Sequence, residues 1–140
     1  MAASQSEFTS TKVNAVYDGG VQATQFTLVK RVISAVDPSD GKIHVTPVTA
    51  TTDKPYGVIQ ENAKTGTACT VVVIGGTLLQ VNPSTAISAG SDLMVDANGF
   101  AVTYATGGGT SYNFGVNDTE VQPNGLTSAI INCATMVKGA

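Results

Sequence analysis

The sequence predicts an all-β fold with at most one short helix, and three observations lead to this prediction. Charged residues make up only 12% of the chain, about half the usual share, and threonine, serine, asparagine and glutamine supply the polarity instead. Threonine suits a pleated strand, whereas glutamate and lysine favour helices. Short apolar runs recur at intervals of roughly 8 to 12 residues with turn residues between them, which is typical of a sandwich or barrel. No long amphipathic helix pattern competes with these runs.

A length of 140 residues indicates one domain, since domains commonly hold about 100 to 200 residues. We expect residues 1–16 to form a flexible N-terminal arm and residues 17–140 to form a single β domain. The arm is rich in alanine, serine and threonine, and Phe8 is its only large side chain before Val13. Such a segment stays mobile unless something ties it down.

Two strands are expected in the first part of the domain. Residues 25–33 (QFTLVKRVI) place Phe26, Leu28 and Val32 on one face, which Lys30 interrupts. A lysine discourages unwanted pairing at a sheet edge, so this strand is expected at an edge. Residues 42–48 (KIHVTPV) alternate in the same way, and the proline within them predicts an edge or a strand end.

The middle of the chain predicts a short strand at residues 55–60 and two hairpins. Residues 69–74 and 77–81 flank Gly75-Gly76, and glycines accept the positive φ angles of tight hairpin turns. Residues 93–95 and 100–102 are joined through Asp96-Ala97-Asn98-Gly99, where Asn-Gly is a strong hairpin signal.

The last part of the chain is less regular. Residues 84–89 could form one helical turn at most. Residues 106–112 are rich in glycine, and residues 113–124 are expected to form a loop with at most one strand. A final strand is expected over residues 128–137, which contain several apolar side chains to bury.

Charge and hydropathy exclude several functions. The net charge is −3 and the seven lysines and arginines are scattered, so no basic stripe is available for a nucleic-acid backbone. The N-terminus lacks the basic start and apolar core of a signal peptide, and no apolar run approaches the ~18 residues of a membrane helix. We therefore expect a soluble protein made in a cytoplasm, with no nucleic-acid or membrane partner.

Candidate catalytic residues have a simpler structural explanation. His44 is the only histidine, has no partner at metal-ligand spacing, and no GxSxG elbow supplies a nucleophile for it. Asp92 and Asp96 lie about 13 Å apart if they flank a strand, beyond the separation of glycosidase carboxylates. Both are expected to be turn residues.

Candidate ligand sites are equally weak. The Gly107-Gly108-Gly109-Thr110-Ser111 stretch lacks the lysine of a phosphate-binding loop, and Asp37-Pro38-Ser39-Asp40-Gly41 is too short for a calcium loop. Cys69 and Cys133 lack metal spacing and are expected to be buried free thiols, with a disulfide as the alternative. We expect no enzymatic activity, catalytic residue, cofactor, metal or small-molecule substrate.

The N-terminal arm is the remaining candidate for a site. It has almost no capacity to form a core, yet it precedes a complete domain. Plain terminal disorder is one interpretation. The other is a segment that adds a strand to a partner's sheet, with these partner-binding residues: Ser4, Gln5, Ser6, Glu7, Phe8, Thr9, Ser10, Thr11, Lys12 and Val13.

Four motifs occur in order between residues 56 and 99. They are Tyr56-Gly57-Val58, residues 70–76 (TVVVIGG), residues 87–93 (ISAGSDL) and Asp96-Ala97-Asn98-Gly99. The ordered set resembles the capsid cement, or head decoration, proteins of tailed bacteriophages. Ser91 departs from the usual Gly-Asp of the third motif, and residues 106–124 are longer than the family's late region.

The resemblance implies a compact sandwich or barrel-like (β-tulip-like) domain that binds the outer capsid surface as a homotrimer at threefold and quasi-threefold positions. It also implies an N-terminal arm that becomes ordered on the major capsid protein and so stabilises the mature shell. Binding only to the assembled shell would stabilise that state by mass action. The alternative is another β structural or adhesion module, such as a virion fibre, a spike or a surface-binding domain.

Overall fold

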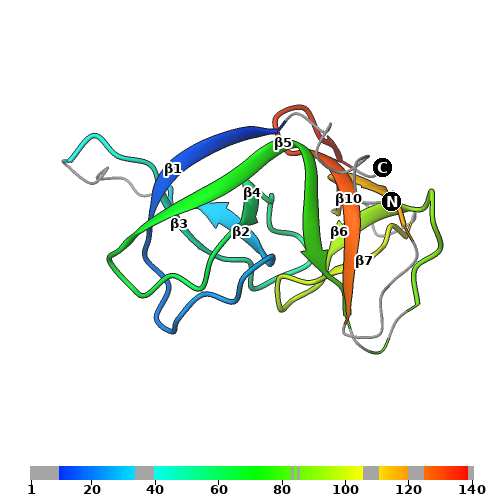
Figure 1. The fold of residues 1–140 in the computed structure, drawn as a ribbon, viewed down its shortest axis with the longest axis horizontal. Helices are drawn as coiled ribbons and strands as arrows, with labels where there is room; N and C mark the ends of the chain where they lie inside the picture. Colours follow the sequence, from blue (N-terminus) through cyan, green and yellow to red (C-terminus); the bar gives the residue numbers. More distant parts are fainter. Residues whose placement is uncertain are drawn as a thin grey trace, which may run out of the picture.

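The computed structural model describes residues 10–33, 40–82, 84, 86–105, 111–119 and 125–138. These residues form strands, turns and loops without a helix, so the predicted all-β class is confirmed (Figure 1). In this part of the chain, accordingly, no helix has the length and hydrophobicity needed to cross a membrane.

Eleven strands are present in the described residues. They are β1 (Thr11–Tyr17), β2 (Leu28–Arg31), β3 (His44–Pro47), β4 (Gly57–Ile59), β5 (Ala68–Gln80), β6 (Asp92–Val95), β7 (Ala101–Thr103), β8 (Tyr112–Asn113), β9 (Gly115–Asn117), β10 (Leu126–Asn132) and β11 (Val137–Lys138). Nine of them form one sheet in the order β1-β3-β2-β4-β5-β10-β9-β6-β7, and β8 pairs with β11.

The first five strands close into a small barrel. The strands are ordered β1-β3-β2-β4-β5. β1 pairs with β3 in parallel and also with β5 in antiparallel orientation, so the first and last strands of this order are joined and the sheet is closed. Large side chains from all five strands are almost completely buried: Tyr17, Leu28, Val29, Val45, Val58, Ile59 and Val71. Closing a sheet removes the unpaired edges that promote aggregation.

The long strand β5 belongs to both halves of the domain. Its first half pairs with β1 and β4, and its second half pairs with β10 over an uninterrupted register from Leu126↔Gln80 to Asn132↔Ile74. β5 bends sharply between the two halves (Figure 1). Beyond β10 the sheet continues through β9 and β6 to β7, which returns to the end of β5 through the bridge Val81↔Ala101.

The hairpin predicted at Gly75-Gly76 is therefore wrong. Both glycines lie inside β5, opposite Ile131 and Ile130 of β10, and Gly75 has a φ of 114°. Glycine in a strand interior commonly marks a sharp bend as well as a turn. Here the two glycines let β5 change direction, so that it pairs with β1 and β4 before the bend and with β10 after it.

The edge position expected for the strand that contains Lys30 is wrong, and so is the edge alternative for the strand that contains Pro47. β2 lies between β3 and β4, and β3 lies between β1 and β2. Lys30 pairs with Asp53 at 2.9 Å, so this lysine has a partner within the domain. Pro47 is the last residue of β3, which confirms the strand-end alternative.

The strand predicted at residues 25–33 is shorter than expected. Thr27 N–H and its Oγ1 both donate to the Thr24 carbonyl, and Phe26 has a φ of 65°. A positive φ is uncommon for a bulky residue and takes Phe26 out of the strand. β2 therefore begins only at Leu28.

The hairpin predicted at Asp96–Gly99 is confirmed. β6 pairs with β7 in antiparallel register from Leu93↔Thr103 to Val95↔Ala101. Asp96 Oδ1 accepts hydrogen bonds from the N–H groups of Asn98 (2.7 Å) and Phe100 (3.0 Å), and Gly99 supplies a positive φ of 81°. Asp96 is the turn residue that was expected.

The C-terminal region holds more strands than expected. β8 lies where the predicted glycine-rich stretch meets the predicted loop, β9 lies within that loop, and the final strand is divided between β10 and β11. β9 lies between β10 and β6. Because it is only three residues long, apolar and polar residues cannot alternate over enough positions to mark it as a strand. Residues 106–110 and 120–124 of the predicted loops lie outside the described residues.

The predicted arm is corrected at its C-terminal end. Thr11–Val16, assigned to the arm, form most of β1, where the register runs from Thr11↔Ile74 to Val16↔Ala68 with an irregularity between Thr11 and Lys12. Ala15 is buried, so this segment contributes to the core. Residues 1–9 lie outside the described residues, and their role as an arm stays a prediction.

Candidate functional site

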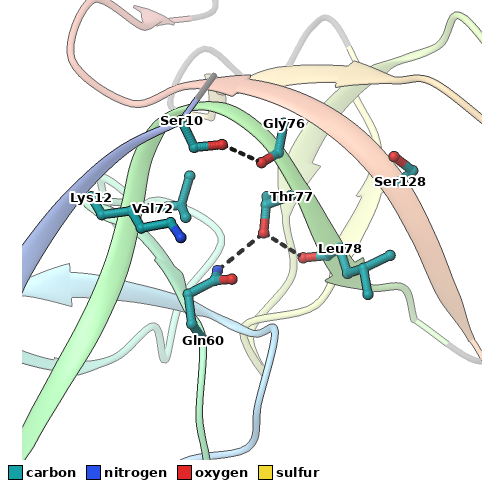
Figure 2. A pocket seen from close by; sticks show the side chains of 8 residues that line it. All are labelled: Ser10, Lys12, Gln60, Val72, Gly76, Thr77, Leu78 and Ser128. Atoms are coloured by element: carbon teal, nitrogen blue, oxygen red, sulfur yellow. Dashed lines mark hydrogen bonds between the residues drawn. The ribbon is translucent and has the colours of Figure 1, made fainter. Parts of the chain in front are cut away.

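A groove opens where β5 bends, and the N-terminal segment enters it (Figure 2). Its walls come from β1, β5 and β10, together with the residue that follows β4. The lining residues are Ser10, Lys12, Gln60, Val72, Gly76, Thr77, Leu78 and Ser128. Two of the predicted partner-binding residues, Ser10 and Lys12, are thus brought together here.

Hydrogen bonds hold the polar side chains of the groove in place. Ser10 Oγ donates to the Gly76 carbonyl at 2.7 Å. Gln60 Nε2 donates to Thr77 Oγ1 and to the Val58 carbonyl, each at 3.0 Å. Lys12 is exposed and extends toward the middle of the groove (Figure 2). The groove therefore presents one cation and several hydroxyl and amide groups. The backbone that carries most of them is held by strand pairing.

The groove is smaller and more polar than a typical small-molecule site. Its volume is about 230 Å³, below the range of about 300 to 1,000 Å³ typical of small-molecule sites, which are also mostly apolar. Carbonyl oxygens and carboxylates are the natural acceptors for an exposed ammonium group and hydroxyls. The described lining residues thus offer hydrogen-bonding groups at the surface, and the Ser10 and Thr77 hydroxyls are bonded to the Gly76 carbonyl and the Gln60 amide.

The other predicted partner-binding residues are distributed as follows. Thr11 is exposed on β1, and Val13 is half-buried against the core and lies opposite Val71 of β5. Ser4, Gln5, Ser6, Glu7, Phe8 and Thr9 lie outside the described residues. Sequence reasoning missed Gln60, Thr77 and Ser128, because β5, β10 and the loop after β4 bring them to one place and no local motif marks them.

His44 lies between two carboxylates. Its Nδ1 is 2.7 Å from Asp18 Oδ2, and its Nε2 is 2.9 Å from Asp40 Oδ2. The hydrogen bond to Asp40, followed by that to Asp18, raises the pKa of His44. The pKa of Asp40 is lowered by hydrogen bonds from the Lys42 backbone N–H and from His44. Since both ring nitrogens face carboxylates, neither is left to activate a nucleophile, as the triad mechanism requires.

Folding stability should depend on pH through His44. A raised folded-state pKa means that the stabilising contribution is fully present below the unfolded value of about 6.5 and is lost as pH rises through the folded pKa. We expect the thermal unfolding midpoint of the natural chain to fall over that interval, measured by circular dichroism. His44→Gln should remove this part of the pH dependence; an unchanged profile in this variant would refute the ion-pair assignment.

The described residues hold no group of three or more metal-ligating side chains. Cys69 and Cys133 are buried free thiols, which confirms the expected state of both. Burial raises the pKa of Cys69 to about 11 and that of Cys133 to about 12. Because the thiolate is the reactive form, these cysteines have a packing role.

The fold is similar to that of a phage protein of known structure. The match is to the N base of head fiber gp8.5 of bacteriophage phi29, with a TM-score of 0.61, 17% sequence identity, and coverage of 89% of this chain and 96% of that chain. No family model matches the sequence. A search of curated proteins also found no match. The similarity at this level of identity concerns the fold, over nearly the whole length of both chains.

Proposed function

We propose that this chain is a structural protein of a bacteriophage virion that binds the outside of the head as a homotrimer and contacts the major capsid protein through its N-terminal segment. The observation that carries the proposal is the shared fold with the base of a phage head fibre. The order of the four motifs, which resembles capsid cement proteins, supports the same location. The low charge of the chain also suits a subunit of a larger assembly.

Between the two kinds of head protein, the structural similarity favours the fibre-base alternative. The matched structure is the base of a fibre, and the match spans nearly all of it. The resemblance to cement proteins implies a subunit that stabilises the shell, whereas the matched structure is the N base of a head fibre. The two functions share the outer capsid surface, so we propose that surface as the location and the base of a head fibre as the more specific role.

The position of the groove supports attachment through the N-terminal segment. Ser10 and Lys12 place the beginning of the described chain at a polar groove with one exposed cation. A segment that becomes ordered on a partner loses conformational entropy but gains main-chain hydrogen bonds and apolar contacts. Three copies in one trimer would multiply modest contacts through multivalency.

Deleting residues 1–9 should leave the domain folded but weaken its binding to heads. The deletion ends before Ser10, so β1 and its pairing with β5 stay intact. We expect the occupancy of heads that lack the protein to fall at least about tenfold, equivalent to about 1.4 kcal/mol, in a co-sedimentation assay. Gln22→Ala on an exposed loop is the control. Equal binding by the truncated chain would exclude the arm as the attachment element.

A further inference from the structure

Four large aliphatic side chains lie exposed together on the outer face of β5, β10 and β9. Their exposed fractions are 39% for Ile74, 40% for Leu78, 44% for Ile130 and 41% for Val116. Ile130 is at the centre, because it lies opposite Gly76 of β5 on one side and Val116 of β9 on the other. Ile74 and Leu78 are the next residues on this face of β5, since alternate residues of a strand share a face. We call these four side chains the outer apolar face.

The two flanks of the outer apolar face carry opposite charges. On the β1 side, Leu78 lines the groove of Figure 2, where Lys12 is the only charged residue of the described lining. On the β6 side, Val116 and Ile130 line a second hollow of about 300 Å³, where Asp92 is the only charged residue of the described lining. Asp92 lies opposite Val116 and is exposed on the same face. Neither Lys12 nor Asp92 forms an ion pair with another described residue.

The outer apolar face has the dimensions of the centre of a protein interface. Single exposed aliphatic residues are normal, but contiguous apolar patches often mark binding surfaces. From Ile74 to Leu78 is about 14 Å along β5, and from β5 to β9 is about 10 Å across the sheet. A standard interface buries about 800 Å² per partner and surrounds its apolar centre with a polar rim. The two charged flanks can supply this rim.

We infer that the outer apolar face joins copies of this chain, with the Ile130 side chains of three copies around one threefold axis and Lys12 of each copy paired with Asp92 of the next. The inference rests on the homotrimer of the proposed function and specifies the surface that forms it. A rotational ring brings one flank of each copy against the opposite flank of its neighbour. Because the two flanks are opposite in charge, all three contacts are attractive, and the charged pairs fix how neighbouring copies are aligned.

The position of the two charges favours a contact between copies. Lys12 on β1 and Asp92 on β6 are separated by β5, β10 and β9, about 19 Å along the sheet. They therefore do not neutralise each other within one copy. A partner surface of a single charge would attract one flank and repel the other, whereas an identical face presents the complementary flank.

Exchanging the two charges tests the contact. Sedimentation equilibrium of the natural chain at submillimolar concentration should give three times the chain mass of 14.2 kDa. Lys12→Asp and Asp92→Lys should each lower the trimer association constant at least about tenfold, because each places like charges together at all three contacts. The variant with both substitutions should regain association, since opposite charges then meet again. A purely structural effect of either substitution would not be reversed by the other.

The apolar centre is tested separately. Ile130→Glu should give the mass of one chain, because it places three carboxylates around the axis. Val21→Glu, at a loop position that is 74% exposed, is the matched control and should remain trimeric. At low concentration, where the subunits are separate, both variants should keep the thermal unfolding midpoint of the natural chain, since exposed substitutions usually change stability little.

Several results would overturn the inference. They are a natural chain with the mass of one or two copies at submillimolar concentration, a trimer that Ile130→Glu leaves intact, and a double charge variant that associates no better than the single variants. Head binding is measured independently by co-sedimentation. A natural chain that binds heads but is monomeric, or whose trimer does not involve Ile130, would refute this interface and leave the location on the head standing. A trimer with these properties that does not bind heads would refute the location alone.

Discussion

Replacing Gly57 with alanine should destabilise the domain severely. A Cβ atom at this position would lie 2.4 Å from the Val72 carbonyl oxygen and 2.5 Å from Val71 Cγ1. Both belong to β5, which pairs with β4 on one side and β1 on the other, so β5 cannot move away without breaking the barrel. Overpacking commonly costs 1 to 3 kcal/mol and occasionally more, and we expect about 3 kcal/mol or more here.

The matched control is Gly20→Ala. A Cβ atom at Gly20 would meet nothing within 4 Å, and exposed substitutions of this kind usually change stability by less than about 0.5 kcal/mol. Thermal unfolding followed by circular dichroism should separate the two variants by about 10 °C in midpoint. Equal midpoints would mean that β4 and β5 do not approach each other as described.

Replacing Ile131 with alanine should cost about 2 to 5 kcal/mol, because it leaves a cavity in a packed core. Ile131 is 1% exposed, whereas the preceding Ile130 is 44% exposed. Ile130→Ala is therefore the control and should cost less than about 1 kcal/mol. The two substitutions have the same chemistry and adjacent positions on β10, so they differ only in the face of the sheet on which the side chain lies.

Urea unfolding followed by far-ultraviolet circular dichroism measures both variants. A reversed order of stability would place β10 one residue out of register, since a one-residue shift moves every side chain to the opposite face. Similar large losses in both variants would show that Ile130 is buried in the folded protein and is not on the exposed face of β10.

Local sequence signals predicted the structural features whose interacting residues are close together in the sequence. The Asp96–Gly99 turn was predictable because the aspartate side chain and the glycine φ are both local requirements. The all-β class followed from composition and from the spacing of turns. Burial of both cysteines agreed with the general behaviour of free thiols.

Structural features that depend on contacts between residues far apart in the sequence could not be predicted from local signals. Gly75-Gly76 suits a turn and a bend equally well, and only the pairing of β5 with both β1 and β10 makes it a bend. Lys30 indicated an edge strand, but Asp53, 23 residues later, provides its partner. The positive φ of Phe26 is set by hydrogen bonds of its backbone to Ile59 and Gln80.

Whether the N-terminal residues bind a partner stays a prediction, but the structure shows where two of them lie. The N-terminal residues Ser10 and Lys12 were selected because they contribute little to a core, and both line the groove. The other walls of the groove come from β5, β10 and the end of β4, which are joined only in the folded chain. Composition can suggest that a segment is free to bind, but it does not say what surface lies beside it.

Cryo-electron microscopy of purified virions from the source tests the central proposal most directly. We expect density for this β domain on the outer surface of the head, arranged as trimers at threefold or quasi-threefold positions, with the residues before Ser10 directed toward the major capsid protein. Virions that contain the protein elsewhere, or heads that remain bare after incubation with a saturating excess of the purified chain, would contradict it.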